Sequence, residues 1–113
     1  MGLTDERCAA PQAGQSPLSA EQAECLSGQV SPDWELEGEA ISRTVVFPGF
    51  DEAMGFVNAV AGLARAEDHH PDLHVSYSRV QVTLSTHKIG GLSRNDFIVA
   101  AKIDQLLRPG PGS

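Results

Sequence analysis

Histidine is the side chain best suited to moving protons near neutral pH, and this chain gathers all its histidines in one region. The stretch "EDHHPDLH" at residues 67–74 holds His69, His70 and His74, and His87 follows at the end of "VQVTLSTH". An unperturbed imidazole changes its charge between about pH 5 and 8, so it can act as a general acid or a general base. The clustering makes acid/base catalysis the first chemistry to consider.

Two other interpretations of the histidines stay open on spacing alone. His70 and His74 are four residues apart, but Pro71 interrupts the helix that a zinc site with this spacing would use. No triad of cysteines or carboxylates accompanies them, so we assign no metal ligand. Histidines also commonly cap a helix C-terminus or stand at a strand end without any catalytic role.

Asp96 presents a similar choice between a structural and a chemical role. In "SRND" at residues 93–96, Ser93 precedes Asp96 by three residues, which is the spacing of a helix N-terminal cap. Such a cap is worth on the order of 1 kcal/mol, and it is the simplest interpretation of Asp96. An indirect role, in which Asp96 orients another side chain, is the alternative.

Three helices are expected to position these residues. The periodicity of apolar residues and the capping patterns predict helices over residues 19–28, 50–70 and 93–107, with N-caps at Ser19, Asp51 and Ser93. Pro71 is expected to end the second helix, because a proline pushes the preceding residue out of the helical region. His69 and His70 would then lie at its C-terminal end, where the helix dipole favours protonated imidazole.

Strand signals fill the intervals between the helices. Residues 33–47 predict a hairpin with its turn at Glu37-Gly38, and residues 73–87 alternate apolar and polar side chains around a turn at Ser78-Arg79. Strand parity places His87 on the polar face of the second hairpin. We therefore expect an α+β fold in the order α-β-β-α-β-β-α, with a four-stranded antiparallel sheet and three helices on one face.

Length and composition limit the possible functions. The chain has 113 residues, 41% hydrophobic and 20% charged, which suits one globular domain over residues 18–107. Residues 1–17 and 108–113 are expected to be flexible tails. The formal net charge is −7 and no basic run occurs, which argues against nucleic acid and anionic membranes as partners.

The sequence also lacks targeting and membrane-spanning patterns. The acidic start "MGLTDERCAAPQAGQSPL" has no apolar core of the kind found in signal peptides. No apolar run approaches the roughly 18 residues that span a bilayer. Cys8 and Cys25 show no metal-ligand spacing and are interpreted as reduced thiols, with a disulfide between them as the alternative. These features predict a cytoplasmic protein.

The ordered polar positions resemble the signature of the pterin-4a-carbinolamine dehydratase family. "HHP" is followed after five residues by Tyr77, and "LSTHKIGGLSRND" matches the family pattern LSTHxxxGLSxxD in order. The resemblance covers residues 18–107. It implies the dehydration of 4a-hydroxytetrahydropterin to quinonoid dihydropterin and water, with a small-molecule pterin as substrate and no metal or organic cofactor.

The resemblance also implies roles for particular residues. His69 and His87 match the family's acid/base histidines, one for each face of the pterin, and His70 matches a histidine associated mainly with binding. Asp96 matches the final Asp of the signature, which is associated with orienting a histidine as well as capping the helix. The other positions that match segments lining the family's pterin site are Asp68, Pro71, Ser85, Thr86 and Lys88.

One position departs from the family pattern. Four residues before the first histidine the family often has Glu, whereas this chain has Arg65, so its rate or pH optimum is expected to differ. Members of the family form homodimers or homotetramers, and a homo-oligomer is expected here. Some relatives have lost the histidines and serve as assembly factors, and others are dimerisation partners of transcription factors. A non-catalytic binding module is therefore the alternative to the enzyme, although the intact histidine set favours the enzyme.

Overall fold

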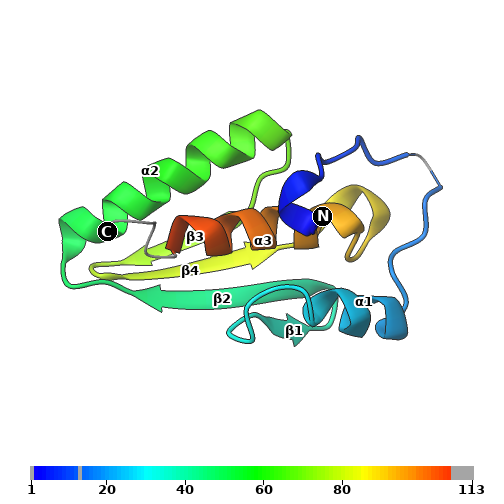
Figure 1. Ribbon diagram of the computed structural model, residues 1–113, viewed down its shortest axis with the longest axis horizontal. Coiled ribbons are helices and arrows are strands. Elements are labelled where there is room, and N and C mark those ends of the chain that lie inside the picture. Colours follow the sequence, from blue (N-terminus) through cyan, green and yellow to red (C-terminus); the bar gives the residue numbers. More distant parts are fainter. Residues whose placement is uncertain (1, 13, 108–113) are drawn as a thin grey trace.

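The computed structural model describes residues 2–12 and 14–107 and confirms the predicted α+β class and element order (Figure 1). The helices are α1 (Ala20–Ser27), α2 (Phe50–Glu67) and α3 (Arg94–Leu107). The strands are β1 (Glu35–Glu37), β2 (Ala40–Val46), β3 (Asp72–Ser76) and β4 (Arg79–Leu84). Two short 3-10 helices, η1 (Leu3–Asp5) and η2 (His87–Ile89), accompany them.

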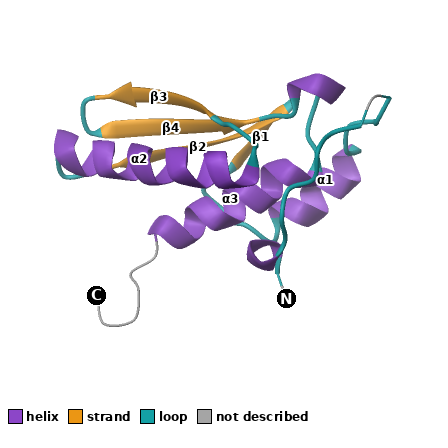
Figure 2. Cartoon of the chain, turned by 90° about the horizontal axis from the view of Figure 1, so that it is seen from above, coloured by secondary structure: helices purple, strands orange, loops and turns teal. Residues whose placement is uncertain are grey.

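The four strands form one antiparallel sheet in the order β1-β2-β4-β3, and the helices cover one of its faces (Figure 2). The alternation predicted for the second hairpin decides which face is covered. Val80, Val82 and Leu84 are fully buried, whereas the alternating residues Arg79 and Gln81 are exposed. The apolar face of β4 therefore forms the floor of the core.

The helices complete this core with side chains at helical spacing. Phe97, Ala100 and Ile103 of α3 are fully buried, as the sequence periodicity predicts, and Val60 of α2 packs in the same cluster. α3 contacts both α1 and α2, and the contact between His69 and Asp96 shows that the start of α3 lies close to the end of α2. That junction is where the candidate functional residues meet.

The boundaries of α2 differ from the prediction at both ends. Gly49 is the N-cap residue, so the predicted N-cap at Asp51 is wrong and Asp51 lies in the first turn. At the other end Asp68 adopts a left-handed conformation with φ 53° and ψ 40°, and its N–H bonds to the carbonyl of Ala64. This cap ends the helix at Glu67, before Pro71 takes effect, so His69 lies in the connection to β3 and not on the helix.

Both hairpin turns lie one residue away from their predicted positions. Gly38 has φ 62° and leads the first turn after β1, and Tyr77 has φ 52° and leads the second after β3. Positive φ is natural for glycine but uncommon for tyrosine. Tyr77 is therefore a turn residue with a largely exposed ring and does not belong to the apolar face of the strand.

The expected flexible tail over residues 1–17 does not hold for residues 3–9. Leu3 is only 3% exposed and joins the hydrophobic core, while the backbone of Cys8 and Ala9 is hydrogen-bonded to side chains of α2 and α3. The polar composition of this segment predicts a flexible tail. It does not reveal that one leucine is buried or that several backbone groups form hydrogen bonds with distant residues in the folded chain. The tail predicted at residues 108–113 lies outside the described residues.

Two features of the structure relate to the predictions about the thiols and about membrane-spanning segments. Cys8 is half-buried and Cys25 is exposed, and both are free thiols, which removes the disulfide alternative. In the described part of the chain, none of the helices combines the length and apolar composition needed to cross a membrane.

Candidate active site

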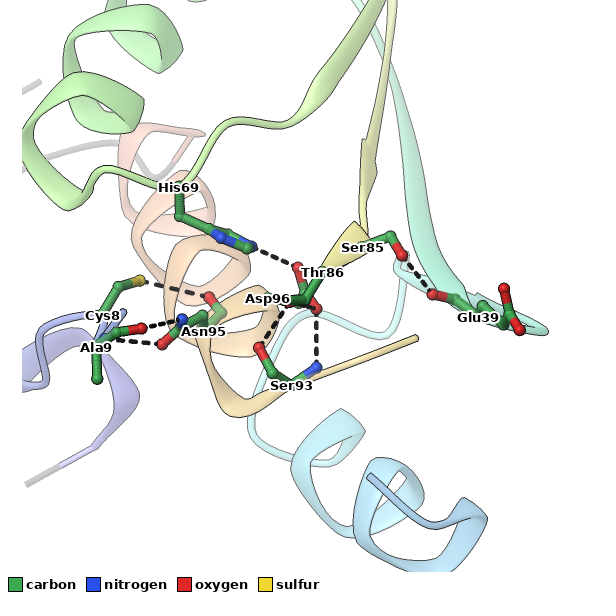
Figure 3. Close-up of polar contacts among 9 residues, drawn as sticks. All are labelled: Cys8, Ala9, Glu39, His69, Ser85, Thr86, Ser93, Asn95 and Asp96. Atoms are coloured by element: carbon green, nitrogen blue, oxygen red, sulfur yellow. Dashed lines mark hydrogen bonds and ion pairs between the residues drawn. The ribbon is translucent and has the colours of Figure 1, made fainter. Parts of the chain in front are cut away.

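A histidine and a carboxylate form a buried pair where the end of α2 meets the start of α3 (Figure 3). Nε2 of His69 lies 2.6 Å from Oδ1 of Asp96, and the exposed fractions of the two side chains are 9% and 0%. An ionised carboxylate only accepts hydrogen bonds, so Nε2 of His69 carries the proton in this contact. The other ring nitrogen, Nδ1, is left available to take up or release a proton.

Two further donors complete the hydrogen bonding of Asp96. Its Oδ2 accepts one hydrogen bond of 2.9 Å from the Thr86 hydroxyl and another of 2.9 Å from the Ser93 backbone N–H. The hydroxyls of Thr86 and Ser93 are 2.7 Å apart. Because Thr86 gives its only hydroxyl proton to Asp96, Ser93 must be the donor between them. The carboxylate thus accepts three hydrogen bonds from neutral groups or from an imidazole.

The two interpretations of Asp96 turn out to use different oxygens of one carboxylate. Asp96 is the third residue of α3, and its Oδ2 reaches back to the N–H of Ser93 in the manner of a capping box. Its Oδ1 faces away from the cap and contacts His69. Capping and contact with a histidine are therefore compatible.

Thr86 reaches this network from the loop that follows β4. Thr86 and Gly91 form an isolated antiparallel bridge, in which the N–H of Thr86 donates to the Gly91 carbonyl at 2.9 Å. The bridge closes a loop that contains η2, and it places Thr86 within reach of α3. His87, the next residue, is therefore tied through its neighbour to the buried carboxylate.

His87 itself lies at the surface, on η2 and not on the sheet. β4 ends at Leu84, so strand parity does not extend to His87, and the prediction that it shares the polar sheet face is wrong. His70 is also exposed and lines a cavity of about 280 Å³ between α2 and the start of β3, together with Arg65, Pro71 and other side chains. Within the described residues neither imidazole makes a hydrogen bond, so both are free to meet a ligand.

The remaining sequence-predicted positions do not join the His69 and Asp96 network. Asp68 is exposed and serves as the left-handed cap of α2. The hydroxyl of Ser85 donates to the carbonyl of Glu39 at 2.8 Å, which connects the end of β4 to the first hairpin. Lys88 is exposed on η2. The structure therefore brings His69, Thr86 and Asp96 together and leaves the other positions around them.

A second buried carboxylate, which no local sequence pattern indicates, lies two residues before His69. Glu67 accepts hydrogen bonds from the Cys8 backbone N–H at 2.9 Å and from Lys102 Nζ at 2.6 Å, and Arg7 pairs with it at 3.1 Å. Burial alone would raise the pKa of Glu67, but these hydrogen bonds and the charges of Lys102 and Arg7 lower it to about 2. Glu67 is therefore a fixed anion at neutral pH.

The described residues contain no group of three or more His, Cys, Asp or Glu side chains arranged to hold a metal ion. His70 and His74, whose spacing suggested a zinc site, lie in different structural elements and are also separated by Pro71. His70 lies in the connection between α2 and β3, and His74 lies on β3. Neither is part of the carboxylate network.

Comparisons with known proteins agree with the predicted resemblance. The family model described as pterin 4 alpha carbinolamine dehydratase matches residues 16–106. A protein of Nitrosomonas eutropha named for pterin-4-alpha-carbinolamine dehydratase activity is 49% identical over 105 residues, covering 93% of each chain. A protein of Halorhodospira halophila with the same name is 47% identical over 108 residues, covering 94% of this chain and 98% of the relative.

Solved structures show the same fold. The crystal structure of a transcriptional coactivator/pterin dehydratase from Brucella melitensis has a TM-score of 0.76 and 31% identity, covering 80% of this chain and 98% of that one. A pterin dehydratase-like protein identified as a RuBisCO assembly factor in the alpha-carboxysome has a TM-score of 0.54 and covers 65% of this chain and 84% of that one. At 20% identity, the second likeness shows the fold alone.

Proposed function

Because this chain belongs to the pterin 4 alpha carbinolamine dehydratase family, we propose that it removes water from 4a-hydroxytetrahydropterin to give quinonoid dihydropterin. In this reaction the bond between C4a and its hydroxyl oxygen breaks, the oxygen leaves as water after gaining a proton, and N5 loses its proton as the N5–C4a double bond forms. Protons and electrons balance without an oxidant or a reductant. The catalyst has to deliver one proton and remove another.

The single observation that carries the proposal is the buried contact between His69 and Asp96. The carboxylate fixes the proton on Nε2 and so leaves Nδ1 of His69 as the proton-exchanging atom, and its negative charge stabilises the imidazolium. The Thr86 and Ser93 hydrogen bonds hold the carboxylate itself in place. Positioned proton transfer of this kind typically contributes about 10² to 10⁴-fold to a rate.

The other site residues take supporting roles in the proposal. His87 serves the second face of the pterin as the other acid/base group, and His70 contributes mainly to binding from its exposed position beside the cavity. Ser85 already donates its hydroxyl proton to Glu39, so it can only accept a hydrogen bond from a pterin N–H. The remaining proposed contacts with the pterin are Asp68, Pro71, Thr86 and Lys88.

We propose that the reaction needs no metal or organic cofactor, because it is redox-neutral and requires only proton transfer. The decay of synthetic 4a-hydroxytetrahydropterin, followed with and without protein, tests the function. The protein should accelerate the decay equally in the presence and absence of a chelator. A rate that chelator abolishes and zinc restores would return the metal interpretation.

The protein is also proposed to form a homodimer or homotetramer. Among the described strands, β1 and β3 are the edges of the sheet, and each presents unpaired backbone groups that a second copy can cover. Light scattering at micromolar concentration should give at least twice the monomer mass. A monomer under these conditions contradicts this part of the proposal. The free thiols fit a cytoplasmic location.

A binding role is the second candidate function. The Brucella melitensis protein is named for both a coactivator and a dehydratase role, so the two need not exclude each other in this fold. In this chain the intact contact between His69 and Asp96 favours the enzyme, since a purely structural relative has no need for a proton-exchanging imidazole. Absence of any rate acceleration in the decay assay would favour the binding role.

A further inference from the structure

We propose that residues Leu3–Ala9, called here the N-terminal strap, position His69 against Asp96, an inference that rests on the proposed dehydratase function. The strap lies outside residues 16–106, the part of the chain that the family model matches. It is nevertheless packed against the ends of the two helices that supply the histidine and the carboxylate. The strap residues are positioning residues, because the strap hydrogen bonds described next reach the chain neighbours of His69 and Asp96.

Two consecutive strap residues hold the chain neighbours of the pair. The N–H of Cys8 donates to Glu67, the last residue of α2, which precedes His69 by two positions. The N–H of Ala9 donates to Oδ1 of Asn95 at 3.0 Å, and Nδ2 of Asn95 donates back to the Ala9 carbonyl at 2.6 Å. Asn95 immediately precedes Asp96. Figure 3 shows Cys8, Ala9 and Asn95 beside the contact that they flank.

The strap is anchored on both sides of these contacts. Leu3 is buried in the hydrophobic core, and η1, to which it belongs, packs against α3. Glu6 accepts two hydrogen bonds, at 2.7 and 2.6 Å, from the guanidinium of Arg94 at the start of α3. Arg7 adds a hydrogen bond of 3.0 Å to the Ala66 carbonyl near the end of α2. The strap therefore spans the gap between α2 and α3 in parallel with the His69 and Asp96 contact.

Such a span matters because the catalytic contact joins two elements that are not consecutive in sequence. His69 follows a left-handed residue at the end of α2, whereas Asp96 is fixed to α3 by its own cap. If the helix ends drift apart, the 2.6 Å contact lengthens and Nδ1 of His69 moves from its working position. A displacement of about 1 Å can cost on the order of 10²-fold in rate. The strap opposes this drift.

Loosening the strap should therefore affect kcat more than KM. Leu3→Ala removes the anchor in the core, and Asn95→Ala removes the two hydrogen bonds to Ala9 without altering the core. Each variant should lower kcat by about tenfold or more and leave KM within about twofold, because His70 and His87 still meet the pterin. Leu3→Met, which refills the core position, should recover most of kcat.

Leu26→Ala is the matched control for a general loss of stability. Leu26 is a buried leucine of α1 in the same core cluster, and it takes no part in the hydrogen bonds by which the strap holds α2 and α3. Its loss should lower the melting temperature to a degree similar to Leu3→Ala while kcat stays near the parent value. The comparison separates a positioning role from a merely structural one.

A measurement without substrate completes the test. In the parent protein, the proton on Nε2 of His69 should give a downfield NMR signal protected from exchange, because it lies in a buried contact with a carboxylate. Leu3→Ala and Asn95→Ala should lose this protection, and Leu26→Ala should keep it. If the strap variants keep both the protected proton and the parent kcat, or if Leu26→Ala loses both to the same extent, the strap has no positioning role. If the parent protein shows no dehydratase activity, the proposed function fails, and the NMR signal still decides whether the strap holds the pair.

Discussion

Two buried carboxylates lie at the junction of α2 and α3, and they differ in the groups that surround them. Glu67 faces the cations of Lys102 and Arg7 and is a fixed anion with its pKa lowered to about 2. Asp96 faces a hydroxyl, a backbone N–H and the imidazole of His69, whose charge changes when it exchanges a proton.

This difference separates a structural carboxylate from a chemical one. A carboxylate paired with a permanent cation keeps the same electrostatic stabilisation when a proton moves nearby, because the charge of its partner does not change. A carboxylate paired with an imidazole stabilises the imidazolium when that ring takes up a proton. We therefore propose that Glu67 holds the helix ends together and that Asp96 supports proton transfer by His69.

Of the changes to the two carboxylates, removing the charge of Asp96 has the larger expected effect on the rate. Asp96→Asn can still accept a hydrogen bond from His69, but it no longer stabilises the imidazolium. We expect kcat to fall by about 10² to 10³-fold with a smaller change in KM. Steady-state kinetics on 4a-hydroxytetrahydropterin measure both constants, and circular dichroism checks that the variant is folded. A folded Asp96→Asn protein with the parent kcat would show that Asp96 is only a helix cap.

Glu67 should instead control stability in acid. Its pKa is lowered from the ordinary value of 4.5 to about 2, so its contribution to stability is complete above pH 4.5 and is lost as the pH falls through 2. Glu67→Gln should flatten the dependence of the unfolding free energy on pH across this window. Urea unfolding at several pH values between 2.5 and 6 measures the dependence, with Glu21→Gln, which alters an exposed glutamate of α1, as the control. An unchanged dependence in Glu67→Gln would contradict the assignment of a fixed anion.

A smaller effect is expected at His70, which contacts neither carboxylate. His70→Ala should raise KM by about tenfold and leave kcat within about twofold, because a contact made equally in the ground state and the transition state changes binding alone. The same kinetic assay decides this. A large loss of kcat would place His70 among the proton-transfer groups and weaken the distinction drawn for His69.

The smallest effect concerns the two thiols. Burial raises the pKa of Cys8 to about 12, and the negative charge of Glu67 adds to the increase, so its thiolate is scarce at pH 8. Cys25 is exposed. Iodoacetamide at pH 8 should modify Cys25 first, and Leu3→Ala should expose Cys8 to modification as the strap loosens. Equal labelling of both thiols in the parent protein would contradict the docked strap.

The fold and part of the site could be predicted from local patterns. The alternation of Val80, Val82 and Leu84 fixed the buried face of β4, and the helical spacing around Phe97 fixed the inner face of α3. The cap spacing of Ser93 and Asp96 is likewise a local signal, and the structure contains that cap. These features depend on neighbours in sequence, which is why they are visible without a structure.

Features that depend on distant parts of the chain were missed or misplaced. The strap depends on hydrogen bonds between residues that are distant in sequence, such as Cys8 and Glu67. No local pattern in this polar segment predicts them. α2 ends before Pro71 because Asp68 takes up a left-handed conformation, which an aspartate adopts only occasionally. His87 lies outside the sheet because β4 ends at Leu84 and the bridge between Thr86 and Gly91 closes a separate loop.

The most direct test of proton transfer by His69 and His87 follows the decay of the two separated 4a-hydroxytetrahydropterin epimers in a stopped-flow instrument. The parent protein should accelerate the decay of both epimers. If each histidine serves one face of the pterin, His69→Ala and His87→Ala should each lose about 10² to 10⁴-fold on one epimer, and the two variants should prefer opposite epimers. Folded variants that turn over both epimers at the parent rate would contradict histidine acid/base catalysis and favour a binding role for this chain.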